Sequence, residues 1–238
     1  MDANELKVLA FDIFGTTVDW RTGVAEQVAR LARARGAEVD AGAFADAWRD
    51  RYGPSMDLVR LGELPWMNLD ALHRRSLDEL LETEGLAGSF DGHDRDELVL
   101  AWHRLPAWPD AVPGLVRLRR RYVLAALSNG GFALLTRLVK AAGLPFDCIV
   151  SAELSGRYKP DPEPYLLTAQ LLDVPPEAVL MVAAHVWDLR GARAAGLRTA
   201  FVGRPMEKGP DRAADQAPPE GADVTVASFL ELAASLDC

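Results

Sequence analysis

The chain is poor in the residues that mark several common classes of protein. It has two cysteines in 238 residues, Cys148 and Cys238, and neither belongs to a CxxC pair. This excludes a disulfide framework, and it predicts a protein of the reducing cytoplasm. The longest apolar runs are far shorter than a membrane span, so we expect no membrane association and no signal peptide.

Positive charge is also scarce. The sequence has 26 Lys and Arg against 35 Asp and Glu, which gives a formal net charge of -9. This balance argues against a nucleic-acid partner, because nucleic-acid binding requires a basic surface. It does not argue against a small acidic substrate, which needs only a local positive pocket.

Short apolar segments alternate with helical patterns along most of the chain. We expect strands at residues 7–13, 122–127, 148–151, 179–183 and 199–202, with a weaker one at 223–226. Helices are expected at 132–142, 162–172 and 189–195, and a last helix at 228–236 follows a surface loop that begins after Pro205. Strand and helix alternation at this spacing implies parallel pairing with right-handed crossovers. The predicted fold class is α/β, with a doubly wound, Rossmann-like parallel sheet.

Residues 19–96 interrupt this alternation, because they contain no convincing strand. Helices are expected there at 22–35, 43–51, 69–82 and 96–103, with breaks at 61–65 and 88–94. We therefore predict a catalytic core formed by residues 1–18 and 97–238, and an inserted all-helical cap formed by 19–96. Such a cap can close over the end of the first strand and exclude water. The alternative is a helical extension that only enlarges the hydrophobic core.

Polar side chains gather at the predicted ends of the strands. They lie in segments 11–17, 127–130, 158–162 and 182–188. In an open parallel sheet, the carboxyl ends of neighbouring strands border one crevice, which is where such folds bind ligands. The sequence therefore predicts one site that includes Asp12, Thr16, Ser128, Asn129, Lys159, Tyr165, His185 and Asp188.

Each residue type has a chemical role open to it. Asp12 is a carboxylate that can attack an electrophile and form an ester. Lys159 can hold Asp12 ionised, since a nearby cation lowers the pKa of a carboxylate. Ser128 and Asn129 offer donors in an Asn-Gly turn, and Asp188 can take a proton from water.

Single motifs also have ordinary structural explanations. Asp12 alone can be a turn or cap residue, and Asp188 can cap a helix that begins at Leu189. Thr16 can bond to Asp12 or orient the turn, and Tyr165 lies early on the helix after Lys159. The occurrence of all the motifs together, each at a strand end, favours a functional site.

With these motifs the chain resembles the haloacid dehalogenase superfamily, and within it the type II 2-haloacid dehalogenases. The resemblance rests on Asp-x-x-Gly-Thr at 12–16, Ser-Asn-Gly at 128–130, Lys-Pro-Asp at 159–161 and the segment ending in Trp187-Asp188. It covers essentially the whole chain. It implies a small 2-haloacid substrate, a halide ion as product, no cofactor or metal, and a homodimer.

The resemblance implies a role for each residue that matches. Asp12 matches the nucleophile and Thr16 the threonine that steadies it. Ser128 and Lys159 match residues that hold the substrate carboxylate and the nucleophile. Asn129 matches a residue near the departing halide.

Other matches are less complete. Asp188 matches the acid that helps to hydrolyse the ester, but Ala183 and His185 stand where better known members carry Ser and Asn. His185 can bond the water, the ester or Asp188, or it can be structural. Arg49 resembles the cap arginine that faces the leaving halide, with Arg51 as a rival and a solvated surface arginine as the alternative.

Aromatic residues near the predicted site fit a small pocket for an alkyl halide. They are Phe14, Trp48, Tyr165 and Trp187. Phe14 stands where many of the related dehalogenases have Tyr. For Trp48 and Trp187, a place in the hydrophobic core is the alternative.

The motifs point away from a magnesium-dependent phosphatase. In the resembling phosphatases a second Asp stands where this chain has Phe14, and Gly-Asp-Ser stands where it has residues 183–185. The predicted reaction is therefore metal-independent hydrolysis of short 2-haloalkanoic acids through an ester at Asp12, with inversion at C2. The segment 184–188 also resembles members reported to accept fluorinated acids, which makes fluoroacetate a candidate substrate. The alternatives are a magnesium-dependent phosphatase or phosphonate hydrolase of the superfamily, and a non-enzymatic binding module.

Overall fold

The computed structural model describes residues 5–238, which build a six-stranded sheet. Its order is β3-β2-β1-β4-β5-β6, and every neighbouring pair is parallel. The strands are β1 (Val8–Phe11), β2 (Val123–Ser128), β3 (Cys148–Ser151), β4 (Val179–Ala183), β5 (Arg198–Val202) and β6 (Val224–Val226). All the predicted strands are confirmed, with ends that differ from the predictions by at most two residues.

Side chains of β1 alternate between two hydrophobic layers, which explains why both faces of the sheet are covered. Leu9 and Phe11 belong to the layer with α6 (Ala111–Leu118), α7 (Phe132–Ala141) and α10 (Phe229–Ser235). Val8 and Ala10 belong to the other layer, with α8 (Pro162–Leu171) and α9 (Val186–Ala194). Short 3-10 helices lie at Ala152–Leu154 and Pro176–Ala178. The doubly wound α/β fold is confirmed.

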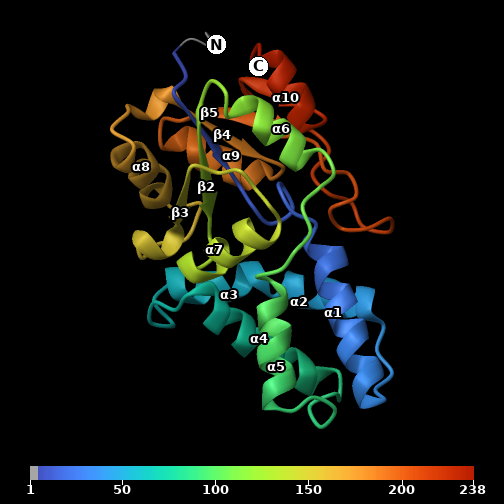
Figure 1. The fold of residues 1–238 in the computed structure, drawn as a ribbon. Coiled ribbons are helices and arrows are strands. Elements are labelled where there is room, and N and C mark those ends of the chain that lie inside the picture. The colour runs from blue at the N-terminus through green and yellow to red at the C-terminus, as the bar shows by residue number, and fades with distance from the viewer. Residues whose placement is uncertain (1–4) are drawn as a thin grey trace.

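The segment after β1 is helical, as predicted. It forms α1 (Trp20–Arg35), α2 (Ala41–Asp50), α3 (Tyr52–Arg60), α4 (Leu69–Thr83) and α5 (Gly92–Ala101). These helices lie together beyond the end of the sheet where β1 and β2 finish (Figure 1). The division into a core and a cap at residues 18 and 96 stays a prediction.

Two helices were not predicted, and a third begins earlier than expected. Helix α3 was not predicted, although Pro54 lies in its first turn, where proline is tolerated. Helix α5 begins four residues before its predicted start and runs through residue 96, because Asp91 and Asp94 form a capping box. The predicted break at 88–94 is therefore wrong for its last residues. Helix α6 was also missed.

Helix α9 corrects a further prediction. It begins at Val186 and not at Leu189, with His185 in the N-cap position. Asp188 therefore lies inside the first turn, and the explanation of Asp188 as a helix cap is wrong. This shift turns its carboxylate toward the strand ends.

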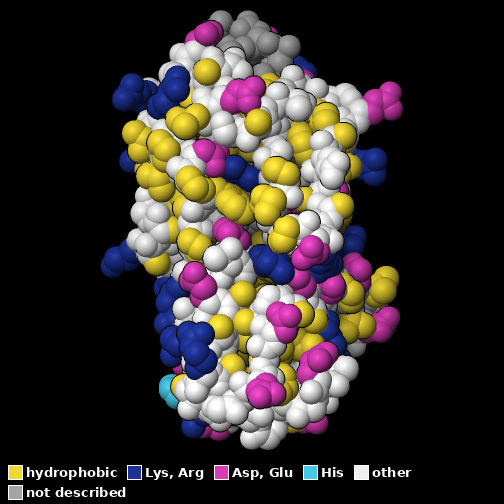
Figure 2. All heavy atoms as spheres, turned by 90° about the vertical axis from the view of Figure 1, so that its right-hand side faces the viewer, with side chains coloured by type: hydrophobic (Ala, Val, Ile, Leu, Met, Phe, Trp, Pro, Cys, Tyr) yellow, Lys and Arg dark blue, Asp and Glu magenta, His cyan; other side chains and the backbone are white. Residues whose placement is uncertain are grey.

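The hydrophobic layer on the α6 side of the sheet continues without interruption into the cap helices. Trp20, Trp48 and Trp102 are almost fully buried in it, and Trp102 packs against both other rings. On the outside, acidic and basic side chains are interspersed over the face shown in Figure 2. None of the helices within residues 5–238 has both the length and the apolar character to cross a bilayer.

Candidate active site

The strand order places the predicted motifs side by side. Asp12 directly follows β1, Ser128 ends β2, and Asp188 lies in the first turn after β4. Because β1 lies between β2 and β4, these three ends are adjacent. Lys159 reaches the same point from the loop before α8.

Asp12 is 5% exposed, and both of its carboxylate oxygens accept hydrogen bonds. Lys159 Nζ donates to Oδ1 at 3.0 Å, Thr16 Oγ1 donates to Oδ2 at 2.7 Å, and His185 Nδ1 lies 3.2 Å from Oδ2. Burial alone would raise the pKa of Asp12, but the charge of Lys159 and the bonds from His185 and Thr16 outweigh it and lower the pKa. The carboxylate is therefore ionised, as a nucleophile must be.

Lys159 links two carboxylates. Its ammonium donates to Asp12, to Asp188 Oδ2 at 2.6 Å and to the Leu127 carbonyl at 3.1 Å, which uses its three protons. Burial works against its charge, but the two carboxylates raise the pKa of Lys159 above its usual value. The side chain is consequently a fixed cation at the centre of the site.

Asp188 is fully buried and has a donor at each oxygen. Lys159 occupies Oδ2, and the Tyr165 hydroxyl donates to Oδ1 at 2.6 Å. Burial, with a contribution from Asp12, raises the pKa of Asp188. Tyr165 was predicted to line the substrate pocket, but the structure places it behind Asp188, fully buried, as a support for that carboxylate.

Thr16 and Asn129 position the loops. The Thr16 hydroxyl accepts a hydrogen bond from Ala184 N at 2.9 Å while it donates to Asp12, so it joins the loops after β1 and β4. The Asn129 amide accepts from Lys159 N at 2.7 Å and donates to Lys159 O at 3.3 Å. Ser128 Oγ accepts from Gly130 N at 3.2 Å, within the predicted turn.

His185 has a second partner that the sequence did not predict. Its Nε2 lies 2.9 Å from Glu207 Oε1, which also accepts from Trp20 Nε1 at 3.1 Å. Glu207 is 2% exposed, although the segment after Pro205 was expected to be a surface loop. That expectation is wrong at this residue, and no local sequence pattern distinguishes Glu207 from the other acids of the segment.

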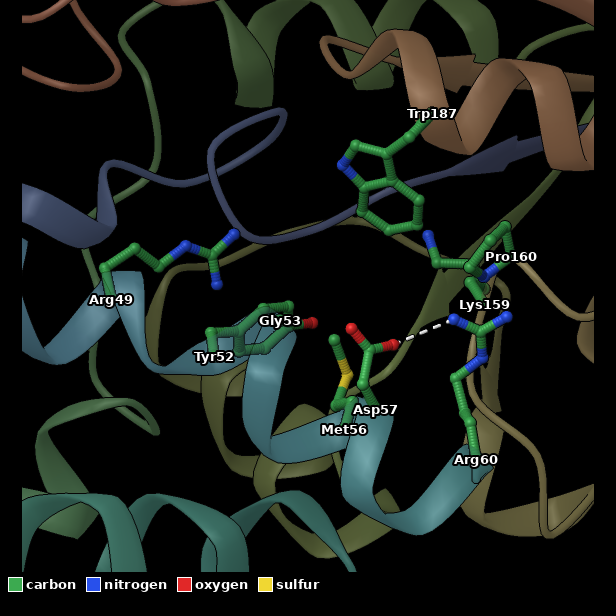
Figure 3. A pocket seen from close by; sticks show the side chains of 9 residues that line it. All are labelled: Arg49, Tyr52, Gly53, Met56, Asp57, Arg60, Lys159, Pro160 and Trp187. Atoms are coloured by element: carbon green, nitrogen blue, oxygen red, sulfur yellow. Dashed lines mark hydrogen bonds and ion pairs between the residues drawn. The ribbon is translucent and has the colours of Figure 1, made fainter. Parts of the chain in front are cut away.

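A cavity of about 300 Å³ lies between α3 and the core. In Figure 3, Arg49 enters it from α2 and Lys159 from the core, with Tyr52 and Trp187 around the space between them. The remaining lining residues are Gly53, Met56, Asp57, Arg60 and Pro160. A second cavity of about 270 Å³ shares Arg49, Gly53 and Trp187 with the first, and is also lined by His185 and Glu207.

Arg49 is better placed than Arg51 to meet an anion. Its guanidinium lies 4.0 Å from the centre of the Tyr52 ring, and its buried Nη1 has no hydrogen-bond partner among the described residues. Arg51 instead donates to the Ala47 carbonyl of its own helix. Tyr52 and Met56 were missed as lining residues because helix α3 was not predicted.

Two residues that were predicted to line the pocket are buried deeper in the protein than the cavities. Phe14 packs edge-on against Trp102, with ring centres 5.7 Å apart. Trp48 donates from Nε1 to the Ser76 hydroxyl and the His73 carbonyl inside the cap. Neither is among the described residues that line the two cavities. Trp187, by contrast, is partly exposed and lines both.

The donor set does not resemble a magnesium site. Residues 5–238 hold no group of three or more His, Cys, Asp or Glu arranged to bind a metal. The oxygens of Asp12 and Asp188 each face a donor, whereas Mg²⁺ requires free oxygen ligands. Independence from metal stays a prediction for the reaction itself.

Comparison with known proteins identifies the family. The model of the haloacid dehalogenase-like hydrolases matches residues 6–196. The chain is 31% identical over 217 residues to (S)-2-haloacid dehalogenase 1 of Pseudomonas sp. (strain CBS-3), covering 84% of this chain and 85% of that protein. A crystal structure of a defluorinating L-2-haloacid dehalogenase superimposes with a TM-score of 0.95 at 46% identity, covering 98% and 96% of the two chains.

A further crystal structure bears on the chemistry. It is an L-2-haloacid dehalogenase from Xanthobacter autotrophicus with chloropropionic acid covalently bound, with a TM-score of 0.82, 25% identity and coverage of 98% of both chains. The strand-end motifs, the sheet topology and these matches agree. The chain therefore belongs to the haloacid dehalogenase-like hydrolases, and within that family to the 2-haloacid dehalogenases.

Proposed function

We propose that this enzyme hydrolyses short 2-haloalkanoic acids to 2-hydroxy acids through an ester of Asp12. The observation that carries the proposal is the buried Asp12 carboxylate, held ionised by Lys159 next to a cavity that Arg49 also lines. A carboxylate fixed in this way can act as a nucleophile on carbon without a metal. The relative with covalently bound chloropropionic acid supports the same chemistry.

In the first step, Asp12 attacks C2 from the face opposite the halogen, and the halide departs toward Arg49. The unpaired Nη1 of Arg49 offers a hydrogen bond to the developing anion, which stabilises the transition state. Ser128 and Lys159 are the predicted partners of the substrate carboxylate. Because attack and departure occur on opposite faces, C2 inverts.

In the second step, water attacks the ester at its carboxyl carbon and releases the 2-hydroxy acid. Several relatives are named for (S)- or L-2-haloacids, which supports the (S) enantiomer as substrate. One close structural neighbour is named as defluorinating, which supports fluoroacetate as a further substrate. A homodimer and a cytoplasmic location stay predictions, and light scattering of the purified protein tests the first.

Single-turnover hydrolysis in heavy-oxygen water tests the ester. With enzyme in excess over (S)-2-chloropropionate, the label is expected in Asp12 and not in the lactate, because water attacks the protein's carboxyl carbon. Label that enters lactate directly contradicts the proposal. The variant Asp12→Asn is expected to release no chloride, and EDTA is expected to leave the wild-type rate unchanged, which separates this activity from a magnesium-dependent phosphatase.

A further inference from the structure

Tyr52 brings a hydroxyl group into the cavity beside the nucleophile. It is the first residue of α3, and it lines the cavity together with Arg49 and Lys159. In Figure 3 its ring lies next to the Arg49 guanidinium, and its hydroxyl points into the space between Arg49 and Lys159. Neither step of the proposed reaction uses this hydroxyl.

The junction between α2 and α3 places Arg49 and Tyr52 on the same wall of the cavity. Arg51 ends α2 and precedes α3 in a helical conformation, with a φ of -80° and a ψ of -10°. The helical turn therefore continues through the junction, and residues three positions apart face the same side. As a result the Arg49 guanidinium carbon lies 4.0 Å from the centre of the Tyr52 ring. The ring holds the cation at the cavity.

The Tyr52 hydroxyl is protonated and feels the charges of the site. Burial has the largest effect on its pKa and raises it, Arg49 lowers it, and Asp12 raises it. The net result is a pKa of Tyr52 above its usual value. A protonated phenol is a hydrogen-bond donor, so this side chain offers a donor in the cavity near neutral pH.

Asn129 has no amide proton left for an anion. Its Nδ2 donates to Lys159 O and to Met56 Sδ, both at 3.3 Å, and its side chain also hydrogen-bonds to the Tyr52 hydroxyl. An amide nitrogen carries two protons, which these three acceptors already share. The place beside the halide that the resemblance implied for Asn129 is therefore open to another donor.

The other cations of the cavity have their protons engaged. Lys159 uses all three of its protons on two carboxylates and a carbonyl. Arg60 donates to two aspartates at the edge of the cavity. Arg49 Nη1, by contrast, has no hydrogen-bond partner within residues 5–238. Two donors open to a new anion, Arg49 Nη1 and the Tyr52 hydroxyl, therefore lie together on one wall.

This wall lies opposite the nucleophile. Asp12 follows β1 in the core, whereas Arg49 and Tyr52 belong to helices on the other side of the cavity. In a displacement at carbon, the leaving group departs from the face opposite the attacking oxygen. A substrate whose C2 faces Asp12 therefore directs its halogen toward Arg49 and Tyr52.

We propose that the Tyr52 hydroxyl is a second hydrogen-bond donor to the departing halide, beside Arg49. This inference rests on the proposed function. Tyr52 is then a catalytic residue, because it touches the leaving atom. Its ring and its hydroxyl have separate tasks, since the ring supports Arg49 and the hydroxyl meets the halide.

The hydroxyl donates a hydrogen bond and keeps its proton. An oxygen of Asp12 forms the bond to C2, and the C2–halogen bond breaks with its electron pair going to the halide. Negative charge therefore moves from Asp12 to the halogen in the transition state, and donors fixed at that point stabilise it. Because a halide is a far weaker base than a phenolate, Tyr52 transfers no proton, and the halide leaves as an anion.

The variant Tyr52→Phe tests the proposal, because it removes the hydroxyl and keeps the ring beside Arg49. Enzyme in excess, at a saturating concentration, is mixed with (S)-2-chloropropionate, and chloride release is followed by rapid quench. We expect release to slow about 10–100-fold, which is typical for loss of a hydrogen bond to a charged group. Tyr122→Phe is the matched control. It removes a hydroxyl at the residue before β2, at the end remote from Ser128, and should release chloride at the wild-type rate.

The leaving group separates halide binding from other roles of Tyr52. Chloride accepts stronger hydrogen bonds than bromide, so the loss should be larger with (S)-2-chloropropionate than with (S)-2-bromopropionate. A hydroxyl that only supports the pocket would slow both reactions equally. A hydroxyl that binds the substrate carboxylate would raise KM for both and leave the rates at saturation unchanged. Inhibition by added chloride, at constant ionic strength, should also weaken in Tyr52→Phe.

A loss that is larger for chloride than for bromide supports the proposal. Wild-type chloride release by Tyr52→Phe, equal losses with the two halogens, or a change confined to KM overturns it while the ester mechanism stands. No chloride release from the wild type overturns the proposed function instead.

A second variant covers the case in which Tyr52→Phe does not fold, as judged by circular dichroism. Replacement of Tyr52 by 3-fluorotyrosine keeps the shape of the side chain and makes its hydroxyl a stronger donor. Chloride release should then be faster than in the wild type. An unchanged or slower rate counts against Tyr52 as a donor to the halide.

Discussion

Arg60 donates from Nε and Nη2 to one oxygen of Asp161, at 3.1 and 3.0 Å. Arg60 ends helix α3 and lines the cavity, while Asp161 is the N-cap residue of α8, two residues after Lys159. The pair thus joins the helical segment to the core at the edge of the site. Both side chains are partly exposed, so the interaction holds the two parts in position with little contribution to stability.

The variant Arg60→Ala is therefore expected to alter binding more than folding. The free energy of unfolding should fall by less than about 1 kcal/mol, and KM for 2-chloropropionate should rise by at most about five-fold. Urea unfolding and initial rates measure the two effects. Arg75→Ala, which breaks an exposed pair with Glu79 inside α4, is the matched control and should leave KM unchanged. Equal KM values for the two variants contradict this role.

Arg49→Gln is expected to slow halide release. It removes Nη1, a donor that has no partner within residues 5–238, and loss of one such group from a transition state costs about 10²–10³-fold in rate. Fluoride accepts stronger hydrogen bonds than chloride, so the loss should be larger with fluoroacetate than with chloroacetate. A fluoride electrode and a chloride assay give the two rates.

Arg51→Gln is the control for this comparison, because Arg51 bonds to the Ala47 carbonyl and does not line either cavity. It should release halide at the wild-type rate. An equal loss of halide-release rate in Arg51→Gln and Arg49→Gln would contradict the assignment of the departing halide to Arg49. If the wild type releases no fluoride above background from fluoroacetate, then fluoroacetate is not a substrate.

Lys159→Met should destabilise the fold as well as abolish turnover. It leaves Asp12 and Asp188 buried without the cation between them, and loss of one partner from a buried ion pair typically costs about 3–5 kcal/mol. Urea unfolding measures the loss. Adding Asp188→Asn should recover part of it, because one of the two buried charges is then removed. Lys140→Met, at an exposed position near the end of α7, should have no comparable effect.

Stability should also depend on pH through His185. The pKa of His185 is about 10 in the folded protein and about 6.5 in an unfolded chain. A pKa that folding raises contributes stability that is complete below about pH 6.5 and is lost as the pH rises toward 10. The free energy of unfolding should fall over this range in the wild type.

His185→Gln provides the comparison, because glutamine does not titrate. Its deficit relative to the wild type should be largest near pH 6 and should shrink toward pH 10. Urea unfolding at pH 6, 8 and 10 measures this difference. Parallel curves for the two proteins show that His185 carries no extra proton in the folded state.

Much of the fold and of the site follows from local sequence. Apolar runs with flanking turns locate the strands, and parallel strands bring their carboxyl ends to one edge. For that reason Asp12, Lys159 and Asp188, far apart in the chain, were predicted to meet, and they do. The resemblance at the same motifs gave the family.

Tertiary packing decided the rest. The rotation of α2 determines that Arg49 and not Arg51 faces the cavity, and the start of α9 at Val186 turns Asp188 inward. Tyr165 and Trp48 support other residues of the protein and do not line the pocket. The sequence did not distinguish these roles, because aromatic residues near a site have the same sequence pattern in either one.

Glu207 shows this limit most clearly. It lies two residues after Pro205 in a segment of polar and charged residues, where local sequence predicts solvent exposure. It is buried because Arg204 fixes its segment to Thr16 and Asp110, and because Gly15 leaves space beside Asp12. The strands and the chemistry at their ends follow from the amino-acid sequence alone, since both depend on neighbouring residues. Only the tertiary structure placed a distant carboxylate against His185, because that contact depends on how loops from different parts of the chain pack together.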